Sequence, residues 1–283
     1  MVMSMPAKEL HALVERALAE DAPTGDLTAT LVVPEGATCR AELRAKAHGV
    51  VSGIEAAQAS FDVAAEQDGL GPVEVAWRVR DGSEVRPGDV LANIEGPART
   101  ILRAERIAIN LLAHLSGVAT LTRAFVTAAK PATILCTRKT TPGLRALERD
   151  AVLAGGGSLH RASLSDAVLI KDNHLRIAGG VAAAVAKAKA GGIPIEVEVE
   201  SMAQLEEAMA AGADRILLDN PTADLVRQAV ARVGDPQRLE ISGGVSLDSV
   251  QSLVEAGARV ISVGRITHSA PSLDISLEVT DVS

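Results

Sequence analysis

Basic side chains end three consecutive apolar runs in the second half of the chain. They are Arg138 and Lys139 after the first run, His160 and Arg161 after the second, and Lys171 after the third. Four fixed positive charges and a histidine would repel one another at close range unless an anionic ligand offset them. The guanidinium fork of arginine suits planar carboxylates, and lysine supplies a compact point charge. The pattern therefore predicts a small ligand rich in carboxylates or phosphates.

Acidic side chains mark the ends of the next two apolar runs. Glu198 or Glu200 marks the fourth run, and Asp219 marks the fifth. Carboxylates at such positions suit a magnesium ion shared with phosphates, or a positive charge that develops on a sugar ring. Glu196, Glu198 and Glu200 alternate, so they face one side of a strand. That face is either exposed to water or needs a cation or lysine partners.

Glycines follow the last two apolar runs. Ser242, Gly243 and Gly244 come after the sixth run, and Gly264 comes after the seventh. Glycine lets backbone amides approach a ligand closely, and the N-terminus of a following helix favours an anion. Glycine also ends strands for purely steric reasons, but this position at the last two strands of a barrel is typical of a phosphate site.

Each of these residues also has a structural interpretation. Lys171 would be a structural partner of Asp172 or Asp219, and His160 taken alone would be a hydrogen-bonded core histidine. The working residues of βα barrels lie at the carboxyl ends of the strands. Because polar residues end nearly every run, we expect them to converge on one mouth, which favours the functional interpretation.

The apolar runs themselves predict the fold. They recur at roughly 20 to 25 residues and alternate with helical stretches, which is the rhythm of βα units. Segments such as SMAQLEEAMAAG begin at Ser and end at Gly, as helix caps prefer. We predict an α/β fold with an incomplete (β/α) barrel of about seven strands, and a doubly wound open sheet is the alternative. The predicted strands are 132–137, 157–161, 167–171, 195–200, 215–219, 238–242 and 259–264.

The first half of the chain has a different pattern. Helical spacing of apolar residues predicts a helix over 6–20, and short β-type runs between Gly and Pro turns predict a compact α+β unit over about 37–100. Apolar residues spaced by three and four over 99–129 predict a long helix or a broken pair. The predicted domains are an N-terminal α+β sandwich domain at 1–112, with the tail 270–283 packed back on it, and the barrel at 113–269.

Composition argues against several classes of protein. The net charge of −8 opposes the positive surface that nucleic-acid binders need, and the absence of Tyr leaves few stacking platforms. No stretch has the roughly 18 to 20 uninterrupted apolar residues of a membrane span. The charged N-terminal segment is typical of an amphipathic helix rather than a signal peptide. Cys39 and Cys136 lie far apart and predict no disulfide framework. We expect a cytoplasmic protein with neither a nucleic-acid nor a membrane partner.

The motifs together resemble the quinolinate phosphoribosyltransferase family, also called carboxylating nicotinate-nucleotide pyrophosphorylases. The resemblance rests on EDAPTGDLTAT, AERIAINLLAHLSGVAT, TRKTTPGLRALE, AGGGSLHR, LIKDNHL, EVEVES, ILLDN, ISGGVS and VGRITHS, which cover nearly the whole chain in family order. It implies an α+β domain beside an incomplete barrel. It also implies that quinolinate and phosphoribosyl pyrophosphate react with Mg²⁺ to give nicotinate mononucleotide, pyrophosphate and carbon dioxide.

The resemblance also implies residue roles. It assigns Lys139, Lys171, Glu198 and Asp219 to catalysis, with Glu198 and Asp219 as the magnesium ligands. It implies a homodimer in which Arg106 enters the neighbouring active site, although the sequence alone favours an exposed arginine paired with Glu105. The substrate-binding residues that it implies are Arg106, Thr137, Arg138, Lys139, His160, Arg161, Lys171, Glu198, Asp219, Ser242, Gly243, Gly244, Val263, Gly264 and Arg265.

Two positions depart from the family pattern. Cys136 stands where the family usually has Asp, and Leu159 stands where it usually has Asn. Both changes remove polarity near the predicted acid site, so they either repack as a neutral pair or indicate a different aromatic acid. A molybdenum-transport-associated branch of the family is the alternative, but its usual pattern lacks the KDNH that begins at Lys171.

Two other classes of protein remain as alternatives. The stretch VRDGSEVRPGDVLANIEG resembles the sandwich of biotinyl and lipoyl carriers, but it contains no lysine to modify. It is therefore interpreted as a structural unit. A barrel that only senses an anionic metabolite would bind the ligand yet release no carbon dioxide.

Overall fold

The computed structural model describes residues 5–283, which divide into two units. Among the described residues, unit 1 comprises 5–121, Pro142–Gly156 and Ala270–Ser283, and unit 2 comprises Thr122–Thr141 and Gly157–Ser269. The segment Pro142–Gly156 thus belongs to unit 1, whereas the sequence analysis placed it in the barrel. Each unit has its own sheet and its own core, so each is described by itself.

Unit 1 is built around an antiparallel sheet of four strands in the order β12-β1-β5-β3. Its strands are β1 (Thr38–Ala45), β3 (Glu74–Trp77), β5 (Val90–Pro97) and β12 (Ile275–Val282), with a separate pair formed by β2 (Gly49–Val50) and β4 (Glu84–Val85). Its helices are α1 (Ala7–Asp21), α2 (Leu27–Val32), α3 (Ile54–Asp68), α4 (Ala98–Ala128, which enters unit 2 at Thr122) and α5 (Arg145–Ala154).

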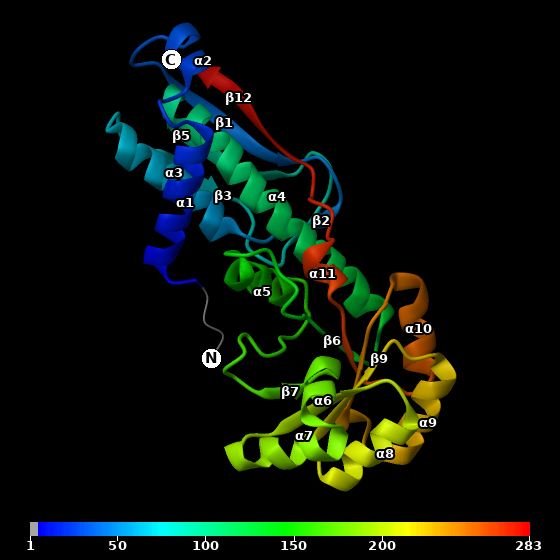
Figure 1. Cartoon of the computed structure of the whole chain (residues 1–283). Helices are drawn as coiled ribbons and strands as arrows, with labels where there is room; N and C mark the ends of the chain where they lie inside the picture. Colours follow the sequence, from blue (N-terminus) through cyan, green and yellow to red (C-terminus); the bar gives the residue numbers. More distant parts are fainter. Residues whose placement is uncertain (1–4) are drawn as a thin grey trace. The chain divides into compact units, whose positions relative to one another are not determined.

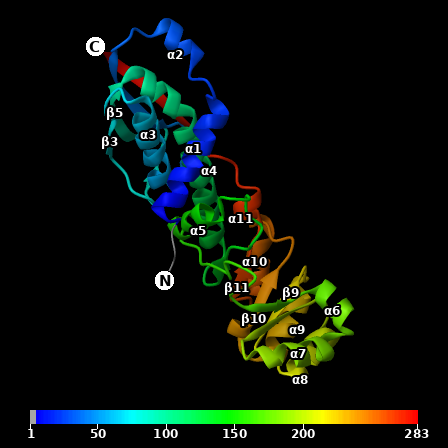
Figure 2. The same cartoon turned by 60° about the vertical axis from the view of Figure 1, so that its left-hand side comes forward.

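Alternating burial explains how the sheet of unit 1 is covered. Cys39, Ala41, Leu43 and Ala45 on β1 are buried, and the residues between them are at least partly accessible, so one face of the strand points into the core. Helices α1 and α3 lie side by side in that unit (Figure 2). By length and composition α4 could cross a membrane, but half of its most apolar window is buried inside the protein, as in a core helix.

Unit 2 contains a parallel sheet of six strands in the order β6-β11-β10-β9-β8-β7. Helices lie outside this sheet (Figure 1). The strands are β6 (Thr133–Leu135), β7 (Val168–Ile170), β8 (Ile195–Val199), β9 (Arg215–Asp219), β10 (Leu239–Ser242) and β11 (Val260–Ser262). The helices are α6 (Asp172–Ala178), α7 (Val181–Ala188), α8 (Met202–Ala211), α9 (Ala223–Val233), α10 (Leu247–Glu255) and α11 (Arg265–His268), with 3-10 turns at Lys189–Gly191 and Pro236–Arg238.

Local sequence sets the boundaries of the helices in unit 2. The side chains of Ser201, Thr222 and Ser246 each accept a backbone N–H in the first turn of the helix that follows. Gly212 ends α8 in the left-handed conformation. These caps fix where three of the helices begin, and because the strands are parallel their carboxyl ends meet at one end of the sheet.

One predicted strand is wrong. The segment 157–161 forms only a single parallel bridge, between Ser158 and Leu135 on β6. Beyond that bridge the chain bends away, and Arg161 donates a hydrogen bond to the carbonyl of Ala167 (3.0 Å). Six strands therefore remain, with β6 and β7 as the edges of an incomplete barrel.

Candidate active site

A cavity of about 360 Å³ lies at the carboxyl ends of the unit 2 strands, and we call it the mouth cavity. Most of its walls were predicted from the sequence, but Leu169, Leu217 and Ser262 were not. The two leucines gave no chemical signal because they look like ordinary core residues. The lining residues are Thr137, Arg138, Lys139, His160, Arg161, Leu169, Lys171, Glu198, Leu217, Asp219, Ser242 and Ser262.

The basic side chains of the mouth cavity are crowded. The pKa of the Arg161 guanidinium lies below its ordinary value, because burial disfavours its charge and Arg138 lies close by. Two arginines and the imidazole of His160 share one wall of this cavity. A bound anion would relieve this repulsion, so the grouping of cations favours an acidic ligand.

Lys171 and Glu198 form an ion pair in the same lining. Lys171 stands at the end of β7 and Glu198 within β8, and the lysine ammonium donates a hydrogen bond to the carboxylate. The side chain of Glu198 is 14% exposed, whereas that of Lys171 is 44% exposed. The lysine can therefore turn toward a ligand more easily than the carboxylate can.

Asp219, at the end of β9, is held by the residue that follows it. The side-chain amide of Asn220 donates to Asp219 Oδ2 (2.7 Å), and the backbone N–H of Asn220 donates to the carbonyl of Ser242 (2.8 Å). Asn220 has a positive φ of 48°, which is uncommon for a residue other than glycine. Asn220 was not among the predicted site residues, although its position next to Asp219 could have indicated a role in the site.

Gly243 fits closely against this pair. Its φ is +83°, and a Cβ atom there would lie 2.5 Å from Oδ1 of Asn220 and 2.6 Å from Oδ1 of Asp219. Gly244 also has a positive φ of +59°. These glycines are therefore required by backbone conformation and by close approach, in addition to any contact with a ligand.

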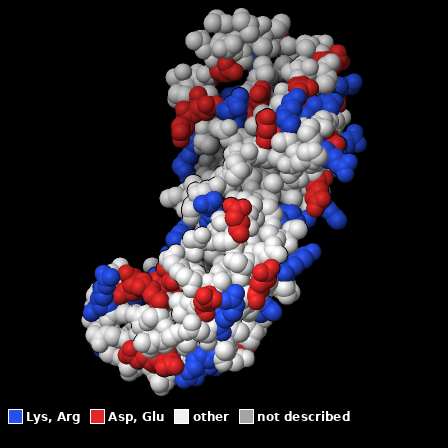
Figure 3. Space-filling model, turned by 90° about the vertical axis from the view of Figure 1, so that its right-hand side faces the viewer, with Lys and Arg blue, Asp and Glu red and all other residues white. Residues whose placement is uncertain are grey.

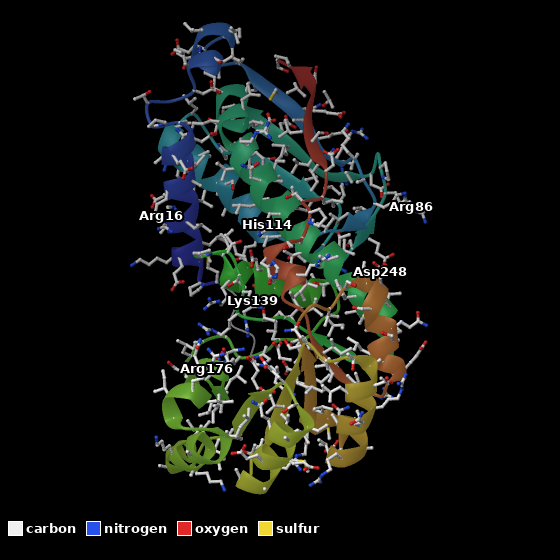
Figure 4. All side chains as sticks on the ribbon, turned by 45° about the vertical axis from the view of Figure 1, so that its right-hand side comes forward. Arg16, Arg86, His114, Lys139, Arg176 and Asp248 are labelled. Carbon is white, nitrogen blue, oxygen red and sulfur yellow. The ribbon has the colours of Figure 1, made fainter. Side chains whose placement is uncertain are left out.

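The loop that carries Lys139, labelled in Figure 4, is tied to α11. The backbone N–H of Lys139 donates to Thr137 Oγ1 (3.1 Å), and Thr267 Oγ1 donates to the Lys139 carbonyl (2.8 Å). A Cβ atom on Gly264 would lie 3.2 Å from the Lys139 side chain. Val263 is buried and Arg265 is exposed; like Gly243, Gly244 and Gly264, they do not line the mouth cavity among the described residues.

The structure resembles known proteins over both units. A family model described as quinolinate phosphoribosyl transferase, N-terminal domain, matches residues 26–116, and the C-terminal domain of the same family matches residues 118–278. This chain belongs to the quinolinate phosphoribosyltransferase family. Its mouth cavity lies within the segment that matches the C-terminal domain.

Relatives of the family cover nearly the full chain. A probable nicotinate-nucleotide pyrophosphorylase [carboxylating] of Bacillus subtilis is 42% identical over 277 residues, which are 96% of this chain and 94% of that protein. The solved nicotinate-nucleotide pyrophosphorylase of Ehrlichia chaffeensis is 31% identical, with a TM-score of 0.90 over 98% of this chain and 100% of that one. The enzyme of the same name from Francisella tularensis is 33% identical, with a TM-score of 0.89 over 99% of both chains.

The two departures from the family pattern lie outside the mouth cavity. Cys136 is fully buried, and its backbone N–H donates to the carbonyl of Ser158 (3.0 Å). Leu159 lines a different cavity, on the far side of His160. Neither residue is among the described residues that line the mouth cavity. Any effect of these two residues on the choice of acid would therefore be indirect, through neighbours such as His160.

Arg106 belongs to unit 1. It is exposed on α4, whereas the other predicted site residues of this family member all belong to unit 2. The face shown in Figure 3 carries interspersed acidic and basic side chains.

Proposed function

We propose that this protein transfers the phosphoribosyl group of phosphoribosyl pyrophosphate to quinolinate, with loss of carbon dioxide, and so makes nicotinate mononucleotide and pyrophosphate. The observation that carries the proposal is the crowded group of cations beside Glu198 and Asp219 in one cavity. The names of the most similar relatives, which are carboxylating nicotinate-nucleotide pyrophosphorylases, support the same activity.

Arg138, His160, Arg161 and Lys171 would hold the two carboxylates of quinolinate. Arginine can donate two parallel hydrogen bonds to a carboxylate, and the leucines of the lining offer an apolar surface to the aromatic ring. Fixing the acid at both carboxylates aligns the ring nitrogen with the anomeric carbon of the sugar, which lowers the entropic cost of the reaction.

The phosphoribosyl donor would occupy the side of the mouth cavity near Lys139 and Ser242. The ring nitrogen attacks the anomeric carbon while the bond to the pyrophosphate oxygen breaks, and positive charge develops on the ribose. Glu198 and Asp219 would stabilise that charge, and Lys139 would contact the departing phosphates. The 5′-phosphate would bind at Ser242, Gly243, Gly244 and Gly264, beside Thr137, Val263 and Arg265.

The quaternary ring nitrogen formed in this way carries positive charge. When the neighbouring carbon–carboxylate bond breaks, carbon dioxide leaves and the electron pair stays on the ring carbon, where the adjacent positive nitrogen stabilises it until that carbon takes up a proton. The role of Arg161 and Lys171 is to hold the carboxylates in place until the nitrogen is alkylated.

We propose magnesium as the cofactor. Glu198 and Asp219 lie on the adjacent strands β8 and β9, line the same cavity and offer oxygen ligands, which Mg²⁺ prefers. Lys171 and Asn220 already hold these carboxylates in fixed directions. The ion would neutralise charge on the pyrophosphate group as that group leaves.

We also propose a cytoplasmic homodimer in which Arg106 of one copy completes the site of the other. Arg106 is exposed, so its charge is accessible to a second copy. Both cysteines, Cys39 and Cys136, are free and buried, as expected in a reducing compartment.

The proposal is tested by offering quinolinate, nicotinate and other aromatic acids to the enzyme with phosphoribosyl pyrophosphate and magnesium. Quinolinate should give by far the highest kcat/KM, because only a dicarboxylate satisfies the whole cationic wall. Turnover of nicotinate in preference to quinolinate would instead indicate a family member with a different acid, such as the molybdenum-transport-associated branch.

A further inference from the structure

A second cavity, which we call the inner cavity, lies inside unit 2 at the other end of the strands. Its volume is about 330 Å³, and the first residues of five strands line it: Thr133, Val168, Ile195, Arg215 and Val260. His160 and Arg161 line both this cavity and the mouth cavity. These two residues therefore form a wall between the proposed substrate site and the cavity at the amino ends of the strands.

Two buried glutamates face this wall from the inner cavity. Glu240 on β10 is 1% exposed, and Glu196 on β8 is 9% exposed. Their Oε2 atoms lie 3.4 Å and 3.5 Å, respectively, from Nε2 of His160. Neither oxygen of Glu240 has a hydrogen-bond partner among the described residues, nor does Oε1 of Glu196. Buried carboxylates in this state are costly, so they depend on nearby positive charge.

Arg215 supplies only part of that charge. Its Nη2 atom lies 3.6 Å from Oε2 of Glu240, and its Nε atom lies 3.7 Å from Oε1 of Glu196. The side chain of Arg215 is 42% exposed, so water screens its attraction, whereas that of His160 is only 13% exposed. Arg161 also attracts Glu196, and a protonated His160 would add a buried positive charge close to both carboxylates.

The contacts of His160 favour an ion pair with the two glutamates over a metal site. The ligand atoms of His160, Glu196 and Glu240 lie within 4.8 Å of one another, which is close enough to surround a metal ion. However, the backbone N–H of Arg161 donates to Nδ1 of His160 (2.8 Å). With that bond the neutral ring carries its hydrogen on Nε2, and the protonated ring carries one on each nitrogen, so in both forms Nε2–H faces the carboxylates and offers no lone pair to a metal.

The carboxylates also favour the charged imidazole. Glu196 contributes most and Glu240 next, and together they raise the pKa of His160 to about 9 against the opposing effect of burial. The amide of Arg161 opposes protonation of Nδ1, but two full charges outweigh one dipole at similar distances. The charged groups around this wall are Arg138 after β6, Arg161, Glu196 on β8, Arg215 on β9 and Glu240 on β10, with Lys171, Glu198 and Asp219 on the mouth side.

We propose that Glu196 and Glu240 are positioning residues, which hold His160 from the inner cavity so that its ring stays fixed and cationic in the wall facing the acid substrate. This inference rests on the proposed function, because the acid that benefits is the dicarboxylate of the mouth cavity. His160 then contributes positive charge, with its Nε2–H facing the carboxylates, and in this charged form Nδ1 no longer accepts the backbone N–H of Arg161.

The test uses the full-length Glu240→Gln variant, which keeps the side-chain shape and removes one charge. NMR titration of His160 in the ligand-free protein should give a pKa about two units below that of the wild type, so that only about a tenth of the ring stays protonated at pH 8. At pH 8 the KM for quinolinate should rise about tenfold, in line with the loss of the imidazolium, while kcat and the KM for phosphoribosyl pyrophosphate change less than about twofold. At pH 6 both proteins keep the charge, so the two KM values for quinolinate should converge.

Two further variants serve as controls. Gln237→Ala lies in the lining of the same inner cavity and should change neither the titration nor the KM. Glu240→Asp keeps the charge and should restore part of the wild-type pKa and KM. If Glu240→Gln does not fold, Glu196→Gln takes its place.

The inference is overturned if His160 of the wild type titrates near 6.5, or if Glu240→Gln raises the KM equally at both pH values without moving the titration of His160. Either result would leave the glutamates with a purely structural role. The NMR titration requires no substrate, so a failure of the proposed function on quinolinate would be recognised separately.

Discussion

At the scale of single residues, the site is defined by charges that the protein itself does not fully neutralise. Arg161 has its pKa lowered by burial and by Arg138, so the folded protein holds these cations against their preference. The hydrogen bond that Arg161 donates to the carbonyl of Ala167 offsets part of this cost. The acid substrate would supply the missing negative charge.

Replacing Arg161 with Ala should therefore weaken acid binding far more than it weakens the fold. The loss of charge-assisted hydrogen bonds should raise the KM for quinolinate about tenfold to a hundredfold. The midpoint of thermal unfolding should change little, since relief of the repulsion with Arg138 offsets the lost hydrogen bond. Steady-state kinetics and a thermal melt of the same preparation check this. An unchanged KM, or a collapse of stability with it, would argue for a structural role.

Residue types and positions predicted most of the residues that line the mouth cavity, but not the buried glutamates that face His160. Arg138, Lys139, Arg161 and Lys171 could be found because polar residues follow nearly every apolar run, and such a series indicates a shared site even though each charge alone has a structural explanation. Glu240 could not, because a lone acid in the middle of LEIS gives no sign of the histidine that it faces. That contact depends on how distant strands are placed beside one another.

At the scale of elements, the strand ends and the loops after them fix the catalytic geometry. The turn after β9 and the turn after β10 interlock, because Gly243 leaves room for both Asn220 and Asp219. The sequence predicted six strands correctly in place, but it also predicted a strand at 157–161 where only one bridge forms. Glycines before that segment and the hydrogen bond of Arg161 favour a bend, and short apolar runs do not reveal such a bend.

Replacing Gly243 with Ala should disrupt the close contact between the turn after β9 and the turn after β10. The positive φ alone would cost about 1 to 3 kcal/mol, and the added Cβ would displace Asn220 and Asp219. We expect lower stability together with a reduced kcat, measured by denaturant unfolding and by initial rates. Gly191→Ala is the matched control, because a Cβ atom there meets nothing within 4 Å and should leave both properties unchanged. Wild-type kinetics in Gly243→Ala would show that Asp219 does not need this support.

At the scale of the whole molecule, family membership and the two-unit organisation agree with the pattern of the sequence. The antiparallel sheet of unit 1 includes β12 from the end of the chain, which pairs with β1 from Cys39 to Ala45. Sequence rhythm predicted the parallel sheet of unit 2, but it could not show that Pro142–Gly156 belongs to unit 1. The role of Arg106 depends on a second copy and so remains a proposal.

Mixing two inactive variants tests that role. If Arg106 acts in the neighbouring subunit, Arg106→Ala and Lys139→Ala should each be nearly inactive alone. After random reassociation in equal amounts, half of the dimers would be mixed and each would have one intact site, so about a quarter of the wild-type activity should return. No recovery, with exchange verified by native mass spectrometry, would place Arg106 in the site of its own chain or outside the site.

The central claim is that the cationic wall holds a dicarboxylate until the ring nitrogen has been alkylated. It is tested most directly with quinolinate labelled at the carboxylate next to the ring nitrogen, together with phosphoribosyl pyrophosphate and magnesium. We predict one labelled carbon dioxide for each nicotinate mononucleotide and each pyrophosphate formed. Nucleotide that retains the label, or carbon dioxide released without nucleotide, would contradict the account.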